Sequence, residues 1–218
     1  MIPLSDESRP LSSIPAVTAS IIAANGMVFL LELINGDAFV QQWSLVPRDV
    51  SAGHHLLTLL TAMFMHGSWS HIIGNMIFLW AFGPELEVAM GGFPYLCFYL
   101  LGGFVAFAAQ IVMDPSSTVP NLGASGAIAC VMGGFMVTYP RDRIRTLLFL
   151  GWFVRVTFVP AALLIGFWFV TQLFSLGEVT DQQGGGVAYM AHIGGLIFGV
   201  VSARFFEGSG LRSQQFGK

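Results

Sequence analysis

Charge is scarce in this chain. Only 10% of its 218 residues are charged, with 9 Lys and Arg against 12 Asp and Glu, whereas soluble domains carry about 25%. Because 55% of the residues are hydrophobic, the composition excludes an ordinary soluble domain and indicates a polytopic membrane protein. The net charge of −3 and the lack of a basic run also argue against a nucleic-acid partner.

Cysteines and metal-binding motifs are equally scarce. The two cysteines, Cys97 and Cys130, lie inside apolar runs, so we expect small buried hydrophobic residues rather than a disulfide or a metal pair. The zinc motif His-Glu-x-x-His is absent, which argues against a metal-dependent membrane protease. Residues 1–13 are polar without an apolar core, so we do not expect a cleaved signal peptide there.

Six apolar runs approach the length of about 20 residues that crosses a bilayer. We therefore predict an all-α membrane bundle of six transmembrane helices. The runs cover residues 14–33, 71–88, 93–113, 124–139, 156–176 and 187–206. Two other apolar stretches, 56–65 and 146–154, are too short to span the bilayer and are expected to be interfacial or re-entrant.

The distribution of basic residues predicts the orientation, because they favour the cytoplasmic side. Both termini are predicted to be cytoplasmic, with tails at 1–13 and 207–218 flanking a membrane domain at 14–206. Glu85 and Glu87 then mark the cytoplasmic boundary of the second span, while the fourth and sixth spans begin at the outer face. Seven of the nine basic residues fall inside in this arrangement: Arg9, Arg141, Arg143, Arg145, Arg204, Arg212 and Lys218.

Four polar side chains lie at the outer ends of three predicted spans. Ser125 begins the fourth span and His192 lies near the beginning of the sixth. His71 and Asn75 are four residues apart in the second span, so they share one face of a helix. Polar and ionisable groups inside a bilayer are costly unless they have a partner or a function. Their common depth therefore predicts a single site.

These residue types fit acyl transfer. A neutral His192 would take the proton of the Ser125 hydroxyl, which is a weak nucleophile on its own. Asn75, a His71 N–H and the free amides at the start of the fourth helix would donate hydrogen bonds to the oxyanion. The nearest acids in sequence lie in a predicted outer loop, so a Ser-His dyad is favoured over a triad.

Each feature also has a simpler explanation. The small residues at 123–126 are a common packing patch, and an isolated Asn75 more often bridges two helices than takes part in catalysis. His66 is expected to be structural. Small residues at every fourth position of the sixth span predict a face that packs closely on a neighbouring helix; they are Ala191, Gly195, Gly199 and Ala203. None of these explanations accounts for four polar groups at one depth.

At these motifs the chain resembles the rhomboid family of intramembrane serine proteases. The similarity rests on His66, His71 and Asn75 in a His-x4-His-x3-Asn pattern, on Gly-x-Ser-Gly at 123–126, and on Ala-His-x-x-Gly at 191–195. It covers residues 14–206, with the spans in the expected order.

The resemblance implies a role for each matched residue. Ser125 would be the nucleophile and His192 the general base, while His66 would hold the first loop. The resemblance also implies transmembrane-helix substrates cut near the outer face, no metal or cofactor, and a multi-pass protein of a bacterial cytoplasmic membrane. The implied oxyanion hole consists of Asn75, His71 and the backbone N–H groups of Ser125 and Ala124.

A departure from the family pattern concerns the residue beneath the histidine. Many members carry an aromatic residue four positions after the serine, where it stacks under the histidine. Here that residue is Ala129, so another group must hold the ring of His192.

Two segments are candidates for controlling access. The glycine-rich loop at 177–186 is expected to be either a lid or an ordinary surface loop. The bulky residues of the fifth span, Phe167 and Trp168 among them, fit a helix that opens sideways for a substrate and equally a helix that faces lipid.

Other function classes remain open from the sequence. A non-catalytic rhomboid-like protein would bind membrane helices, but such relatives usually lack the serine or the histidine that this chain has. A transporter or metal channel would use His66, His71 and His192 as ligands, but no inverted repeat supports that interpretation.

Overall fold

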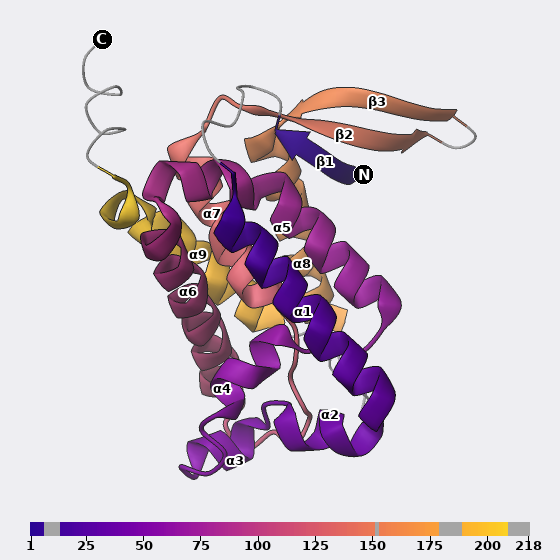
Figure 1. Cartoon of the computed structure of the whole chain (residues 1–218), viewed down its shortest axis with the longest axis vertical. Helices are drawn as coiled ribbons and strands as arrows, with labels where there is room; N and C mark the ends of the chain where they lie inside the picture. Colours follow the sequence, from indigo (N-terminus) through magenta and orange to yellow (C-terminus); the bar gives the residue numbers. More distant parts are fainter. Residues whose placement is uncertain (7–13, 151–152, 179–188, 209–218) are drawn as a thin grey trace.

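The computed structural model describes residues 1–6, 14–150, 153–178 and 189–208. The chain is mostly helical, and its long helices run roughly along the long axis of the molecule (Figure 1). The elements are β1 (Ile2–Asp6), α1 (Ala16–Asn35), α2 (Asp37–Trp43), α3 (Pro47–Ser51), α4 (Thr58–Thr61), the 3-10 helix η1 (Ala62–Phe64), α5 (Trp69–Met90), α6 (Gly92–Met113), α7 (Ser125–Thr138), β2 (Arg143–Leu150), β3 (Phe153–Pro160), α8 (Ala161–Glu178) and α9 (Tyr189–Phe206).

Within the described residues, four helices are long and apolar enough to cross a membrane, namely α1, α5, α6 and α9. Each of the other two predicted runs also contains a helix. α7 has 14 residues, and α8 has 18. The helical membrane fold is therefore as predicted, while the count of six spans stays a prediction.

The prediction of an all-α fold is wrong at one end of the molecule. Residues 143–150 and 153–160 form the antiparallel strands β2 and β3, and β1 pairs with β2 to give the order β1-β2-β3. β-branched and aromatic residues are dense in this stretch and favour strands. The fifth run, predicted to begin at Val156, therefore becomes helical only at Ala161, because Val156 pairs with Leu147 in the sheet.

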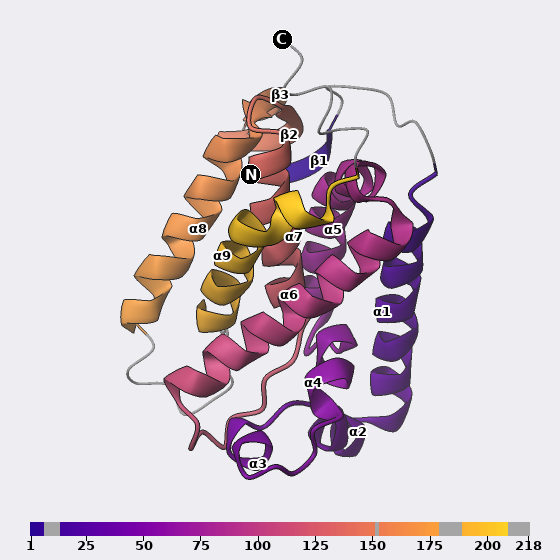
Figure 2. The same cartoon turned by 90° about the vertical axis from the view of Figure 1, so that its left-hand side faces the viewer.

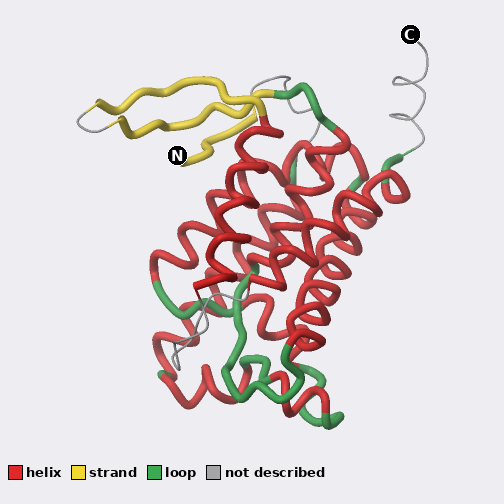
Figure 3. Tube along the Cα trace, turned by 180° about the vertical axis from the view of Figure 1, so that it is seen from behind, coloured by secondary structure: helices red, strands yellow, loops and turns green. Residues whose placement is uncertain are grey.

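The sheet lies beyond one end of the helices and projects sideways from them (Figures 1 and 3). The segment predicted as an N-terminal tail contributes its edge strand, with Ile2 opposite Leu147 and Asp6 opposite Ile144. Ile144 is fully buried and belongs to the core, so the base of the sheet is anchored to the bundle.

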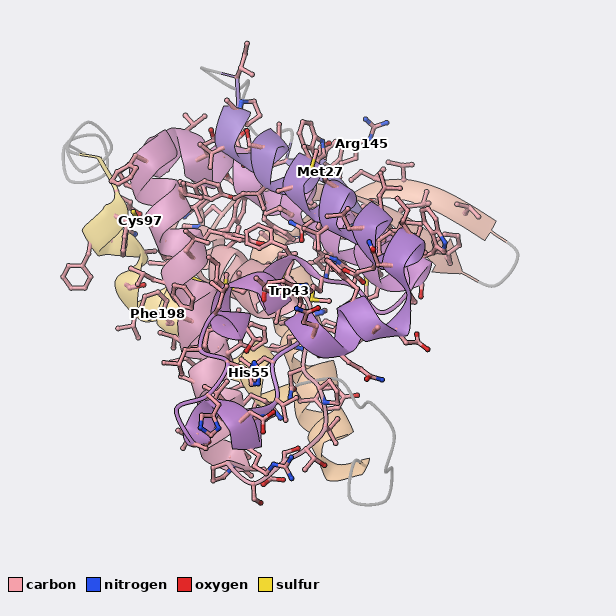
Figure 4. The ribbon with its side chains drawn as sticks, turned by 60° about the horizontal axis from the view of Figure 1, so that its bottom comes forward. Met27, Trp43, His55, Cys97, Arg145 and Phe198 are labelled. Atoms are coloured by element: carbon pink, nitrogen blue, oxygen red, sulfur yellow. The ribbon has the colours of Figure 1, made fainter. Side chains whose placement is uncertain are left out.

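The core is organised around α7, whose residues from Gly126 to Phe135 are all buried. It packs against α5, α6 and most extensively α9, and Figure 2 shows α6 and α9 in front of it. Figure 4 labels Cys97 of α6 and Phe198 of α9 on the side of the bundle where these two helices meet.

The contact between α7 and α9 is made backbone to backbone. A Cβ atom added to Gly195 would overlap the carbonyl oxygen of Gly126, and one added to Gly199 would overlap that of Cys130. The predicted small-residue face of α9 is therefore confirmed, and glycine is needed there because any side chain would force the helices apart.

Glu85 and Glu87 do more than mark the end of a span, since both are buried. The Glu87 carboxylate accepts hydrogen bonds from the N–H groups of Val17 and Thr18 at 2.9 and 2.7 Å, and from the Thr18 hydroxyl at 2.8 Å. These amides belong to the first turn of α1, where the N–H groups have no hydrogen-bond acceptors within the helix itself. Glu87 thus caps α1 from α5.

The backbone contact gives a test with a matched control. Gly199→Ala should lower the free energy of unfolding by about 1–3 kcal/mol, because the added methyl group meets the Cys130 carbonyl. Gly166→Ala in α8 should be neutral or stabilising by up to about 1 kcal/mol, since nothing lies within 4 Å of the added atom. Unfolding of both variants in mixed micelles measures the difference, and equal stabilities would contradict the proposed packing.

Candidate active site

Ser125 and His192 meet where α7 and α9 begin. Ser125 is the first residue of α7, and His192 lies in the first turn of α9. The Ser125 Oγ and His192 Nε2 atoms are 2.7 Å apart. Because the α7–α9 contact at Gly126 and Gly195 lies next to both residues, the close backbone packing brings the two side chains within hydrogen-bond distance. The prediction that they converge is confirmed.

The environment of His192 shows what replaces the expected aromatic residue at position 129. The ring of Trp168, from α8, lies 5.3 Å from the His192 ring between centroids, at an interplanar angle of 47°. Tyr189 approaches the same ring edge-on at 6.4 Å. Ala129 is fully buried against α9 near Gly195, so α9 occupies the space that a larger residue would need.

Sequence reasoning did not identify Trp168 as a neighbour of His192. The only signal was its place in the aromatic-rich fifth run, and that pattern is equally typical of a lipid-facing helix. The pairing depends on how α8 packs beside α9, which a single sequence does not specify.

His71 covers the loop that leads to Ser125. A Cβ atom added to Gly123 would lie 2.9 Å from the His71 Nε2 atom and 3.6 Å from the Ser125 Oγ atom. Gly123 also has a φ of +131°, a conformation that favours glycine. The Gly123 N–H donates to the Ala62 carbonyl at 2.8 Å, which fixes this loop against η1.

Asn75 lies on the same side of the site and contacts His66. The Asn75 Nδ2 atom is 2.9 Å from the His66 Nε2 atom. An amide nitrogen only donates, so the His66 Nε2 atom accepts and the ring carries its proton on Nδ1. Asn75 retains a second N–H for another acceptor. His66 is thus buried and structural, as predicted.

Backbone amides complete the polar lining. Ala124 is the N-cap residue of α7 and is fully buried. The Ile128 N–H donates to the Ala124 carbonyl at 3.0 Å, so the N–H groups of residues 125–127 precede the first hydrogen bond of the helix. Free amides at a helix N-terminus favour negative charge nearby, and Ser125 stands among them.

The glycine-rich loop predicted at 177–186 is a possible lid, but from residue 179 onward it lies outside the described residues. Within the described part of the chain, no group of three or more His, Cys, Asp or Glu side chains is arranged to hold a metal ion.

Comparison with known proteins identifies the family. The Rhomboid domain family matches residues 53–207, which contain the histidines, the asparagine and the serine of the site. The chain is 30% identical over 210 residues to RHOMBOID-like protein 12, mitochondrial, of Arabidopsis thaliana, which covers 88% of this chain and 59% of that protein.

Two more relatives are also named as rhomboid proteins. Rhomboid protein 1, mitochondrial, of Saccharomyces cerevisiae is 25% identical over 167 residues, covering 75% of this chain and 45% of the relative. Rhomboid protease GlpG of Serratia proteamaculans is 25% identical over 187 residues, covering 86% and 61%. The chain thus spans about half to three-fifths of the length of these curated relatives, and it belongs to the rhomboid family.

Proposed function

We propose that this protein is an intramembrane serine endopeptidase that cleaves transmembrane helices of other membrane proteins. The observation that carries the proposal is the 2.7 Å distance between the Ser125 Oγ and His192 Nε2 atoms, which lie on different helices. A serine hydroxyl beside a buried imidazole is the arrangement that activates a nucleophile. Membership of the rhomboid family, whose relatives include named proteases, supports the same conclusion.

The reaction follows from the two side chains. His192 Nε2 takes the hydroxyl proton as Ser125 Oγ attacks the scissile carbonyl carbon, giving a tetrahedral oxyanion. The imidazolium then gives this proton to the departing amine, the C–N bond breaks, and an acyl ester of Ser125 remains. His192 next takes a proton from water, whose oxygen attacks the ester. The carboxylate product leaves, and the proton returns to Ser125.

Hydrogen-bond donors from α5 and from the start of α7 stabilise the oxyanion of the tetrahedral intermediate. The second N–H of Asn75, the His71 ring, and the backbone amides of Ser125 and Ala124 are the groups we assign to this role. Such donors matter because they are already oriented when negative charge develops. Removing one donor of this kind typically costs about 10²- to 10³-fold in rate.

Trp168 is assigned a positioning role for the base. Its indole ring lies against His192, where an aromatic face restrains the imidazole and accommodates positive charge on it. Because Trp168 belongs to α8, a sideways displacement of α8 to admit a substrate helix would also change this contact. Substrate entry and orientation of the base are therefore linked through one residue.

We place the protein in a membrane with both termini on the cytoplasmic side and the site toward the outer face. The basic residues of the sequence support this orientation. A bacterial cytoplasmic membrane is the proposed location, and the mitochondrial relatives indicate that the family also works in other membranes.

The central prediction concerns the two reacting side chains. Ser125→Ala and His192→Ala should each lower cleavage of a model transmembrane substrate in liposomes by at least about 10³-fold. Ser20→Ala and His54→Ala are matched controls, since the exposed Ser20 hydroxyl donates to the Ala16 carbonyl of its own helix and His54 is exposed. Binding of helices without cleavage by the wild type would favour the non-catalytic alternative, and full activity in either active-site variant would contradict the assignment.

A second prediction distinguishes the specific contact of Trp168 with His192 from the general effect of removing a large side chain from α8. Trp168→Ala should lower kcat about 10-fold, while Trp168→Phe retains most of it because an aromatic face remains. Phe167→Ala is the matched control, because Phe167 is the neighbour of Trp168 in α8 and is itself 57% exposed. Steady-state kinetics on the same substrate measure this, and an equal loss in the Phe167 variant would contradict a specific role for Trp168.

The burial of His66 leads us to expect that the free energy of unfolding depends on pH. Burial, reinforced by the neighbouring His71 ring and partly offset by the Phe64 backbone, lowers the pKa of His66 from 6.5 to about 4. Between these pH values the unfolded chain binds more protons than the folded protein, so stability falls as the pH drops.

The contribution of neutral, buried His66 to the free energy of unfolding should be complete above pH 6.5 and largely lost by pH 4. Between pH 7.5 and pH 5, His66 should account for a loss of about 2 kcal/mol in the free energy of unfolding. His66→Gln should show a correspondingly smaller pH dependence than wild type in micelles. An unchanged pH dependence in this variant would show that His66 is not buried in its neutral form.

A further inference from the structure

The buried carboxylate of Glu32 points to a role for α1 in the site. Glu32 is the only charged residue of α1, and its side chain is 5% exposed. An ionisable group inside a membrane span is costly without a specific partner. Both carboxylate oxygens face the backbone N–H of His66, at 2.9 and 3.2 Å. The partner lies 34 residues further along the chain.

The segment held by Glu32 reaches both halves of the site. We call residues 62–66 the bridge segment. At one end, the Ala62 carbonyl accepts the N–H of Gly123, two residues before Ser125. At the other, the His66 ring accepts from Asn75. A displacement of this segment would therefore move the nucleophile loop and an oxyanion donor together.

A second contact of α1 reinforces the attachment. Phe29 lies one helical turn before Glu32, and its ring meets that of Trp69 edge-on at 4.9 Å. Trp69 is the first residue of α5. The same face of α1 thus contacts both the bridge segment and the start of the helix that carries His71 and Asn75.

We propose that Glu32 is a positioning residue of the proposed protease, holding the bridge segment so that Asn75 and the Gly123–Ser125 loop keep the geometry needed for oxyanion stabilisation. This inference rests on the proposed function. Glu32 contacts neither Ser125 nor His192 in the described contacts, so it acts through the bridge segment. Because that segment holds an oxyanion donor and the nucleophile loop, the effect falls on the rate of the chemical step.

The variants for the test follow from the hydrogen bond. Glu32→Ala removes the acceptor for the His66 N–H, whereas Glu32→Gln keeps a carbonyl oxygen in its place. Glu87→Ala is the matched control, because Glu87 is another buried carboxylate that binds backbone N–H groups. Its contacts lie at the opposite end of α1 from Glu32, away from the bridge segment.

The full-length protein in liposomes, with a model transmembrane substrate, gives the kinetic test. Glu32→Ala should lower kcat between about 10- and 100-fold, with KM changed less than about 2-fold, because oxyanion donors act mainly in the transition state. Glu32→Gln should recover most of kcat. Glu87→Ala should lower the melting temperature while the folded enzyme keeps its kcat. Unchanged kcat in Glu32→Ala, or a loss explained by the unfolded fraction as in Glu87→Ala, would overturn the proposal.

Hydrogen exchange keeps this test separate from that of protease activity. If wild type does not cleave, the proposed function fails, and exchange of the peptide containing residues 62–70 still decides whether Glu32 holds the segment. Faster exchange there in Glu32→Ala, but not in Glu87→Ala, is the expected result. Equal exchange in both variants and wild type would show that Glu32 does not position the bridge segment.

Discussion

The carbonyl oxygens of Gly126 and Cys130 lie directly against the glycine face of α9. No side chain fits between the two backbones, so the distance between the helices is set by backbone atoms alone. Ser125 and His192 are one and three residues from this contact. A 2.7 Å approach of their side chains therefore needs no flexible adjustment. Rigid elements of this kind hold reacting groups more accurately than loops.

Three buried carboxylates lie around this contact, and each has hydrogen-bond partners on another segment of the chain. Glu87 caps the start of α1, and Glu32 near its end holds the bridge segment. At the end of α9, Glu207 accepts from the Thr138 hydroxyl at 2.8 Å and pairs with Arg204 at 3.0 Å. Each carboxylate joins segments distant in sequence, which compensates for the cost of burying it. α1, α5, α7 and α9 are thereby fixed relative to the site.

Much of this arrangement was predictable from the sequence. The apolar runs predicted the helices, the spacing of small residues predicted that one face of α9 packs closely on a neighbouring helix, and the depth of Ser125 and His192 predicted their meeting. The hairpin β2–β3 was missed because its apolar residues look the same as the beginning of a span. The partners of Glu32, Glu87 and Trp168 were missed because each depends on contacts between distant segments, which no local pattern specifies.

Labelling with a fluorophosphonate probe tests the central claim most directly, because the probe reacts only with a serine whose hydroxyl is activated. The protein is treated in membranes, and the modified residue is located by peptide mass spectrometry. The account predicts a single labelled residue, Ser125, in wild type and no labelling in His192→Ala. Labelling of a different serine, or equal labelling of Ser125 without the imidazole, would contradict the assignment of nucleophile and base.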